Sequence, residues 1–265
     1  MSLAGLTVGF FGLGEAGSLI SADLASAGAT VAGYDPAPVD TPDNVRRVTD
    51  PRSAVGGADL VMAATAATDA MHALVQALEE IPAGAVYADL ATASPVRKQH
   101  LAAVAATRSL AFADVALMAM VPGNGLYAAS LASGPGAARY AALLAPASVP
   151  VEVVGDEPGL AATRKLLRSV VLKGLPALLI ESLRAAEAAG LATETWQNVV
   201  GQLETLDAGF LRRLLEGTDT HSERRLAEMQ AGVELLESLG ITPTMTSATV
   251  ESLRRMPTEG LPALP

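Results

Sequence analysis

Three glycines near the start of the chain have a spacing that could hold a phosphorylated ligand. Residues 7–17 read TVGFFGLGEAG, a G-x-G-x-x-G pattern directly after an apolar run. In such a pattern the first glycine permits a tight turn, the second lets the backbone approach a pyrophosphate, and the third lets a helix pack closely on a strand. A helix that begins at about Glu15 would offer N–H groups and the positive end of its dipole to the phosphates. The pattern predicts a dinucleotide-binding loop made of Gly12, Leu13, Gly14, Glu15, Ala16 and Gly17.

An acid ends the next apolar run and bears on the choice of nucleotide. Asp35 follows the run ATVAGY, close to the ~20-residue spacing at which such an acid reads a ribose. A carboxylate there accepts hydrogen bonds from ribose hydroxyls and repels a 2′-phosphate. The three residues after it carry no positive charge, and the first basic residues come at Arg46 and Arg47. We therefore expect NAD in preference to NADP.

A lysine much further along the chain could move a proton. Lys165, Ser169 and Lys173 are spaced four residues apart, so they share one face of a predicted helix that begins near Gly159. A lysine in an apolar cleft can act as a general acid or base near neutral pH, because desolvation disfavours its charge. The alternative interpretation of the spacing is an exposed basic face without chemistry.

Small and polar residues also follow two of the predicted strands. Thr65 and Ala66 come after one strand, and Thr92 comes after the next. Both threonines could contact the ribose or the nicotinamide of a cofactor, since ligands of such sheets lie beyond the carboxyl ends of the strands. The alternative is that they cap the helices that follow. Ser94 is the better cap for the second helix, because it stands directly before a proline.

Strand and helix patterns alternate through the first part of the chain, which is typical of a parallel sheet with crossover helices. Helices are expected between the strands, among them Asp69–Glu80 and Pro95–Ala106. From about Gly159 only helical patterns continue, with breaks expected at 174–176, 190, 217–220 and 240–243. The sequence predicts an α/β Rossmann domain with a parallel-rich sheet over residues 1–157, followed by an all-α C-terminal domain over 158–265. The expected strands are Thr7–Phe11, Thr30–Tyr34, Asp59–Ala64, Ala85–Leu90, Ala111–Leu117, Ser130–Ser133 and Val151–Val154.

The composition excludes several classes of function. The chain has 265 residues with a net charge of −10, which argues against a nucleic-acid partner. It has no cysteine, hence no disulfide, thiolate metal site or thiol nucleophile, and no His, Asp and Glu cluster has metal-ligand spacing. The N-terminus lacks the basic segment of a secretion signal, and no apolar run reaches the ~18 residues of a membrane span. We expect a cytoplasmic protein without metal, membrane or nucleic-acid partners.

Together these motifs resemble the β-hydroxyacid dehydrogenases, the superfamily of 6-phosphogluconate and 3-hydroxyisobutyrate dehydrogenases. The resemblance extends over nearly the whole chain and is strongest to a branch whose C-terminal helical domain has no assigned function. It implies a Rossmann domain joined by a long helix to an all-helical domain, and pairing of two helical domains into a homodimer. It also implies that Lys165 is the catalytic acid/base and that Thr92 lies beside the cofactor. The matching segments are 12–17, 89–95, 114–122, 159–174 and 221–229.

The chain departs from this family where substrate binds. The family's Ser-Gly-Gly element, which holds a substrate carboxylate, is replaced by Met118, Ala119 and Met120, as in the unassigned branch. The asparagine one turn after the catalytic lysine is replaced by Ser169, which can still form a hydrogen bond. On a later helix Arg224 could anchor an anionic substrate, because a guanidinium binds a carboxylate through two hydrogen bonds. The alternative there is a solvated, ion-paired face.

Three functions stay open at this point. The first is an NAD-dependent dehydrogenase that acts on the CH–OH group of a small compound, with Lys165 and Ser169 as catalytic residues. The second is reduction of an imine, since related folds reduce C=N bonds, but relatives of that type tend to carry Asp or Tyr in place of the lysine. The third is a dinucleotide-binding or sensing protein without turnover.

Overall fold

The computed structural model describes residues 2–264 of the chain. These residues form two compact units, and the chain passes from the first to the second between Arg168 and Ser169. The division falls inside helix α6 (Leu160–Ala188), shortly after the boundary at 157/158 expected from the sequence. We describe the two units separately as the sheet unit and the helical unit.

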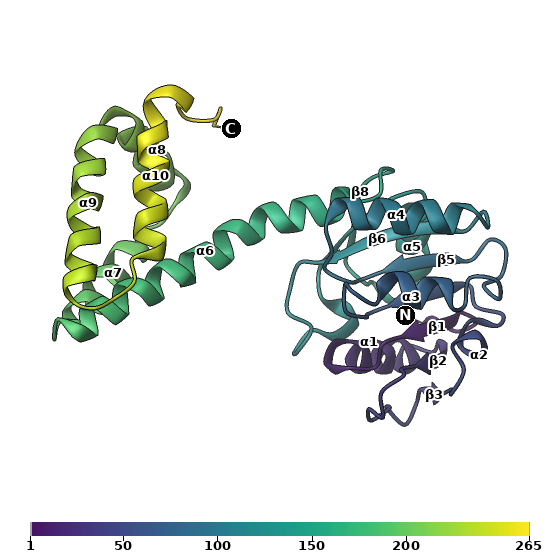
Figure 1. The fold of residues 1–265 in the computed structure, drawn as a ribbon. Coiled ribbons are helices and arrows are strands. Elements are labelled where there is room, and N and C mark those ends of the chain that lie inside the picture. Colours follow the sequence, from purple (N-terminus) through teal and green to yellow (C-terminus); the bar gives the residue numbers. More distant parts are fainter. Residues whose placement is uncertain (1, 265) are drawn as a thin grey trace. The chain divides into compact units, whose positions relative to one another are not determined.

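The sheet unit is built on one eight-stranded sheet with the strand order β3-β2-β1-β4-β5-β6-β7-β8. Figure 1 shows this sheet with helices packed around it. The first six strands in this order, β3, β2, β1, β4, β5 and β6, are mutually parallel. Strand β7 runs antiparallel to β6, and β8 runs parallel to β7. The predicted parallel-rich Rossmann sheet is therefore confirmed. The strands are β1 Thr7–Phe11, β2 Thr30–Tyr34, β3 Arg46–Arg47, β4 Leu60–Ala63, β5 Val86–Asp89, β6 Ala111–Leu117, β7 Ser130–Ser133 and β8 Val151–Gly155.

Helices cover both faces of this sheet, which explains why its central strands are apolar on both sides. On one face Phe10 and Met62 pack with buried residues of α1 (Glu15–Ser26) and α5 (Ala137–Leu144). On the other face Phe11 packs with residues of three helices. These are α2 Pro51–Val55, α3 Ala70–Val75 and α4 Pro95–Ala106. The helices that follow the neighbouring strands β1 and β4 thus lie on opposite faces, and this arrangement opens a crevice at the carboxyl ends of the two strands.

Two local elements differ from the sequence prediction by more than one residue at an end, whereas β4, β5 and β8 differ by a single residue at one or both ends. Strand β3 was not expected, because two residues are too few to show a strand period; it exists through its pairing with β2. Helix α3 ends at Val75 rather than at Glu80, and the chain continues to Glu80 in turns. The predicted bounds of β1, β2, β6 and β7 are confirmed.

The helical unit contains the remainder of α6 and four further helices, which confirms the predicted all-α region. Helices α9 and α10 pack against each other along their length (Figure 1). Glu181 of α6 fixes the start of α10, since its carboxylate accepts hydrogen bonds from Met245 N at 2.7 Å and from Thr246 N and Oγ1 at 2.8 and 2.7 Å. The helices are α7 Ala192–Leu203, α8 Ala208–Thr220, α9 Ser222–Ser238 and α10 Thr244–Glu259.

The helix breaks expected near 190 and 240–243 are confirmed, whereas those expected at 174–176 and 217–220 are wrong. Residues 217–220 form the last turn of α8, and the helix is interrupted one residue later, at His221. Helix α6 continues through Pro176. A proline inside a helix leaves the carbonyl four residues earlier without its N–H partner. That residue is Leu172, which is 48% exposed, so water is available to that turn. A further break, before α8, was not expected; Asp207 caps this helix by accepting a hydrogen bond from Phe210 N at 2.6 Å.

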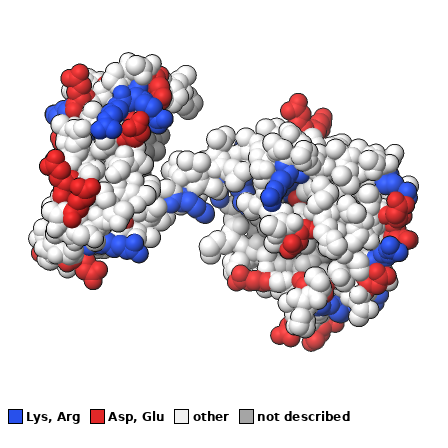
Figure 2. All heavy atoms as spheres, viewed as in Figure 1, with Lys and Arg blue, Asp and Glu red and all other residues white. Residues whose placement is uncertain are grey.

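The surface of both units mixes charged and apolar side chains. On the face shown in Figure 2, basic and acidic residues are interspersed among larger uncharged areas. None of the helices within residues 2–264 combines the length and apolar character needed to cross a membrane. Helix α6 nevertheless carries large exposed apolar side chains within the helical unit, at Val170, Val171, Leu172, Leu175, Leu178 and Ile180.

Candidate functional site

Two glycines of the loop between β1 and α1 are required by the fold itself. Gly12 has a φ of +85°, and a Cβ added there would lie 2.6 Å from the carbonyl oxygen of Ala64. A Cβ added at Gly17 would lie 1.8 Å from the carbonyl oxygen of Gly12. Only glycine avoids both the backbone strain and these clashes. The tight turn and the close approach of α1 that the pattern predicts are therefore present.

The third glycine of the pattern, Gly14, has no such structural cause. Its φ is −65°, a value that any residue adopts, and a Cβ added there would meet no other described atom within 4 Å. Gly14 is also the N-cap of α1 and offers no side-chain acceptor to the first-turn N–H groups of Glu15 and Ala16. Open space above unpaired helical N–H groups is what an approaching pyrophosphate needs. A dinucleotide therefore fits this loop.

Asp35 is held at the same edge of the sheet, directly after β2. Its Oδ2 accepts a hydrogen bond from Leu13 N at 2.7 Å, and its Oδ1 accepts one from Ala37 N at 2.8 Å. These bonds fix the carboxylate beside the glycine loop. They also occupy the backbone N–H of Leu13, whose side chain is buried, so Leu13 contributes to the site by positioning Asp35.

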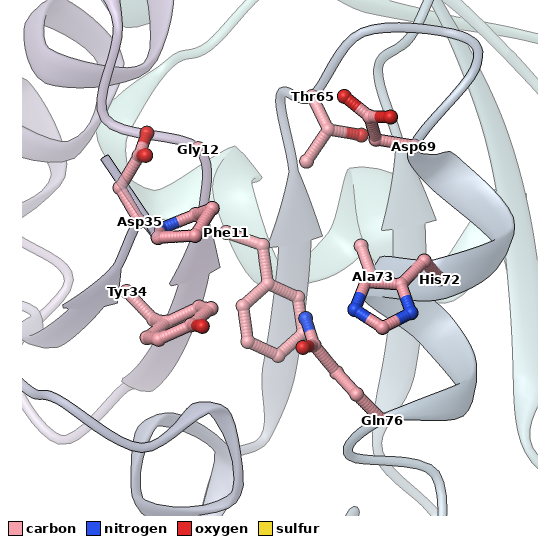
Figure 3. Close-up of a pocket in the computed structure, with 10 residues that line it drawn as sticks. Phe11, Gly12, Tyr34, Asp35, Thr65, Asp69, His72, Ala73 and Gln76 are labelled. Carbon is pink, nitrogen blue, oxygen red and sulfur yellow. The ribbon is translucent and has the colours of Figure 1, made fainter.

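A pocket of about 360 Å³ lies in the crevice beyond β1 and β4 (Figure 3). A volume of this size is within the roughly 300–1,000 Å³ typical of small-molecule sites. One wall is formed by the ends of β1 and β2, and the other by the segment after β4 and one face of α3, as the opposing positions of Asp35 and His72 show (Figure 3). Its lining is Phe11, Gly12, Tyr34, Asp35, Pro36, Thr65, Asp69, His72, Ala73 and Gln76.

Sequence reasoning missed the α3 wall of this pocket. Asp69 and Gln76 are the N-cap and C-cap of α3, and their spacing of three and four residues from His72 puts all three on one side of that helix. The available signal was the position of that helix, since a helix that begins directly after β4 presents its first turns at the carboxyl edge of the sheet. The lining adds a carboxylate, an imidazole and an amide opposite Asp35.

Thr65 lies in the pocket with an unsatisfied hydroxyl. Its Oγ1 is buried and has no hydrogen-bond partner among the described residues. A buried polar atom without a partner is costly, so a ligand that offers one is favoured there. The alternative that Thr65 caps the next helix is wrong, because the N-cap of α3 is Asp69. Ala66 follows Thr65 and is exposed.

Lys165 and Thr92 meet in the sheet unit. The Nζ of Lys165, on the second turn of α6, donates a hydrogen bond to Thr92 Oγ1 at 2.9 Å. Thr92 belongs to the segment between β5 and α4, at the same sheet edge as the glycine loop. Ser94 caps α4 as predicted, by accepting a hydrogen bond from Arg97 N at 3.4 Å, so the hydroxyl of Thr92 has no capping role.

A buried ion-pair cluster lies next to this pair. Lys98 Nζ is 2.8 Å from Asp89 Oδ2 and 3.0 Å from Asp114 Oδ1, and all three side chains are at most 1% exposed. Asp114 Oδ2 accepts a hydrogen bond from Ala162 N at 3.0 Å, which ties the first turn of α6 to β6. Asp114 and Lys165 line one small hollow together with Thr92. The cluster therefore fixes the two segments from which Thr92 and Lys165 project.

The cluster also constrains protonation. Burial raises the pKa of Asp89 above its ordinary value, although the charge and hydrogen bond of Lys98 oppose the shift. Sequence reasoning missed Lys98. The signal was its spacing to Leu101 and Ala105, which places the lysine on the buried face of α4.

The predicted substrate segment follows β6 in the sheet unit. Met118 is half-buried and its carbonyl accepts a hydrogen bond from Arg168 Nη2 at 2.8 Å, whereas Ala119 is exposed and Met120 is 74% exposed. Arg168 thus brings a cation to a segment that has no charged or hydroxyl side chain of its own.

The two remaining predicted residues lie in the helical unit. Ser169 is half-buried, one turn after Lys165 on α6, and Arg224 is exposed on α9. Their roles stay predictions.

Comparison with known families assigns the two parts of the chain separately. Residues 7–121 match the NAD binding domain of 6-phosphogluconate dehydrogenase. Residues 186–256 match a domain of unknown function (DUF1932). An uncharacterized 28.5 kDa protein of Methanothermus fervidus is 31% identical over 101 residues, and this match spans 40% of that protein's length.

Solved structures resemble nearly the whole chain. A conserved hypothetical protein from Sinorhizobium meliloti is 30% identical, with 97% of this chain and 91% of that chain covered and a TM-score of 0.63. A reductive aminase from Aspergillus terreus in complex with NADPH is 19% identical, with coverage of 97% and 95% and a TM-score of 0.78. An imine reductase variant from Myxococcus stipitatus in complex with NAD⁺ is 18% identical, with coverage of 96% and 94% and a TM-score of 0.78. The last two show the fold alone.

The two family models match the sheet unit and the helical unit of this chain, and the relative at 30% identity covers 97% of it. The chain therefore belongs to the β-hydroxyacid dehydrogenase superfamily of NAD(P)-dependent oxidoreductases, in the branch whose C-terminal helical domain has no assigned function.

Proposed function

We propose that the protein is an NAD-dependent dehydrogenase that acts on the CH–OH group of a small compound, with Lys165 as general acid/base. The observation that carries this proposal is the 2.9 Å hydrogen bond from Lys165 Nζ to Thr92 Oγ1. It places an amine at the sheet edge where the glycine loop and Asp35 lie, within the same unit. A proton-transfer group at that edge is what oxidation of an alcohol requires beside a hydride acceptor.

The cofactor site follows from the geometry of the sheet unit. Bound NAD would supply the hydride acceptor. Gly14 and the first-turn N–H groups of α1 would hold the pyrophosphate, and Asp35 would accept hydrogen bonds from the ribose hydroxyls. Thr65 Oγ1, which is buried and lacks a partner among residues 2–264, would gain one from the bound nucleotide. The same carboxylate of Asp35 would repel a 2′-phosphate, which favours NAD over NADP.

Lys165 would take the proton of the substrate hydroxyl at Nζ during oxidation and return it during reduction. Thr92 would orient the amine through the hydrogen bond already present, and Ser169 would offer a second hydroxyl one turn further along α6. The Met118 to Met120 segment would contact the substrate, with Arg168 of the same unit as the cation that recognises an anionic group. Such a substrate is a small hydroxy acid or its oxo form.

The decisive experiment is a turnover assay with a panel of 3-hydroxy acids and simple alcohols. NADH formation is followed by absorbance for the wild-type protein and for Lys165→Ala. Turnover in the wild type that is lost in the variant supports the proposal. Binding of NADH without turnover of any compound in the panel would favour a sensing protein instead.

A second candidate is reduction of an imine. The support is that the similar structures include an imine reductase and a reductive aminase. NADH oxidation in the presence of a ketone alone, and of the ketone with an amine, separates the two reactions. A rate that depends on the amine would favour C=N reduction over the CH–OH proposal.

We also propose that the protein forms a homodimer through its helical unit. The exposed apolar side chains of α6 are joined in this unit by Trp196 of α7 and by Leu211 and Leu214 of α8, each more than 40% exposed. Light scattering tests this proposal, since a monomer would have the chain mass of 26.9 kDa.

A further inference from the structure

Arg47 reaches the segment that follows Asp35 although it is distant in the sequence. Strand β3 pairs with β2 in parallel, with Arg47 opposite Gly33. This pairing brings Arg47 next to the end of β2, where Asp35 follows the strand. The sequence suggests that no basic residue lies close to Asp35, whereas in the structure the Arg47 guanidinium donates a hydrogen bond to the Asp35 carbonyl oxygen at 2.7 Å.

The Arg47 guanidinium donates hydrogen bonds to every second residue of this segment. Arg47 Nη2 donates to the carbonyl oxygens of Asp35 and Ala37 at 2.7 and 2.8 Å. Nη1 donates to the carbonyl oxygen of Val39 and to Thr41 Oγ1 at 3.0 and 2.9 Å. The segment bends at Pro36 and Ala37, where Val39 N donates a hydrogen bond to the Ala37 carbonyl oxygen at 2.8 Å. One planar, fork-shaped guanidinium binds all four acceptors along it.

The composition of the segment explains why it depends on this arginine. Residues 35–42 read DPAPVDTP, and three of the eight are prolines, which have no N–H to donate. The segment therefore has few N–H groups for a regular ladder, and apart from the bond from Val39 N to Ala37 O its carbonyl oxygens need donors from elsewhere. Arg47, half-buried beneath it, supplies them.

These bonds also decide what Arg47 cannot do. An arginine beside the acid at the end of β2 is a potential receptor for the 2′-phosphate of NADP. Each terminal nitrogen of a guanidinium carries two hydrogens, and both terminal nitrogens of Arg47 already donate two hydrogen bonds. The group has only its Nε–H left for a phosphate.

We propose that Arg47 is a positioning residue for cofactor choice. It clamps the segment 35–41 so that the carboxylate of Asp35 stays fixed toward the ribose, and it does so without contributing a phosphate receptor. This inference rests on the proposed NAD binding at Asp35. Releasing the clamp lets the carboxylate move, which weakens binding of NADH and reduces repulsion of NADPH.

The test compares dissociation constants for NADH and NADPH in the full-length protein, measured by nicotinamide fluorescence. Arg47→Met should reduce the preference for NADH by about tenfold, the value of one hydrogen bond between a hydroxyl and a carboxylate. Arg46→Met is the matched control, because it makes the same charge change at the exposed neighbour on β3 and should leave the preference unchanged. A larger preference for NADH in Arg47→Met would show that Arg47 binds the 2′-phosphate of NADPH. An unchanged preference would show that the hydrogen bonds of Arg47 do not affect cofactor selectivity. Either result overturns the inference.

A second measurement needs no cofactor. Hydrogen exchange of the amides in residues 37–45 should be faster in Arg47→Met than in wild type, and unchanged in Arg46→Met. Thr41→Val removes one acceptor only and should give a smaller change in the same direction, which keeps the test valid if Arg47→Met does not fold. Equal exchange in all variants contradicts the clamp. If the wild type binds NADPH more tightly than NADH, both the proposed cofactor and the clamp are contradicted. If the wild type prefers NADH and the ratio of the two dissociation constants is unchanged in the variants, only the clamp is contradicted.

Discussion

The amine of Lys165 and the hydroxyl of Thr92 are joined by a hydrogen bond of 2.9 Å, although 73 residues separate them in the chain. The bond connects the start of α6 to the segment after β5. The cluster of Lys98, Asp89 and Asp114 holds both segments. Asp114 accepts a hydrogen bond from Ala162 N of α6, and Asp89 accepts one from Ala91 N, next to Thr92. Because a buried network holds both ends, the amine has a defined position before any substrate binds.

Substitution of the proposed acid/base should affect chemistry and not cofactor binding. General acid–base groups typically contribute ~10²–10⁴-fold to rate, so Lys165→Ala should reduce kcat by that order. The dissociation constant for NADH should stay close to that of the wild type, because the glycine loop and Asp35 are untouched. Lys173→Ala on the same helix is the control and should retain turnover. Full turnover in Lys165→Ala would end the assignment.

Removal of the ribose-binding acid should change the choice of nucleotide. The wild type should bind NADH more tightly than NADPH, and Asp35→Ala should narrow the difference, since it removes both the acceptor for the ribose hydroxyls and the repulsion of a 2′-phosphate. Parallel titrations with the two nucleotides measure this. Asp40→Ala, an exposed acid in the same segment, should not alter the ratio.

Removal of the buried lysine should destabilise the sheet unit strongly. Lys98→Met leaves Asp89 and Asp114 buried without their cation, and loss of one partner from a buried pair typically costs about 3–5 kcal/mol. The pKa values of carboxylates without a compensating cation rise in the folded state, so the variant should regain stability as pH falls from 7 toward 5. Thermal unfolding followed at several pH values tests both effects. A variant as stable as the wild type at pH 7 would show that the cluster does not hold the fold.

The start of α10 should depend on an ionised carboxylate. Burial acts to raise the pKa of Glu181, but hydrogen bonds from Thr246 and Met245 outweigh it, and the pKa lies below its ordinary value. A lowered pKa means that the stabilisation is fully present above the unfolded-state value of about 4.3 and is lost as pH falls through the folded-state value.

Glu181→Ala should therefore destabilise the helical unit at pH 7, by about 1.5–3 kcal/mol for hydrogen bonds to a charged group. The difference from the wild type should shrink under acidic conditions below the folded-state pKa. Glu187→Ala, an exposed acid near the end of α6, is the matched control. A constant difference across the pH range would mean that the charge of Glu181 is not involved.

Local signals predicted most of the architecture and the nucleotide loop. The bounds of β1 and β2 follow from short apolar runs flanked by turns, and Gly12 and Gly17 are required for reasons that operate within a few residues. Lys98 could not be assigned in the same way, because its partners come from β5 and β6 and meet it only when the sheet is assembled. The break expected at Pro176 is wrong for another reason: a proline removes one helical hydrogen bond, and at the exposed turn of Leu172 the helix tolerates that loss.

The contacts of Arg47 with the segment after Asp35 could not be predicted from the sequence. By chain distance it lies twelve residues from Asp35, and the two-residue strand that brings it back is too short to predict. Its effect on the site depends on which hydrogens of its guanidinium are already used, and only the assembled contacts show this.

The division of the chain also separates its natural chromophores. All four tyrosines, Tyr34, Tyr87, Tyr127 and Tyr140, belong to the sheet unit, and the single tryptophan, Trp196, belongs to the helical unit. Tryptophan emission therefore reports unfolding of the helical unit alone, and tyrosine absorbance reports unfolding of the sheet unit. One denaturant titration read at both signals shows whether the units unfold together, in which case the curves coincide, or one after the other, in which case they separate.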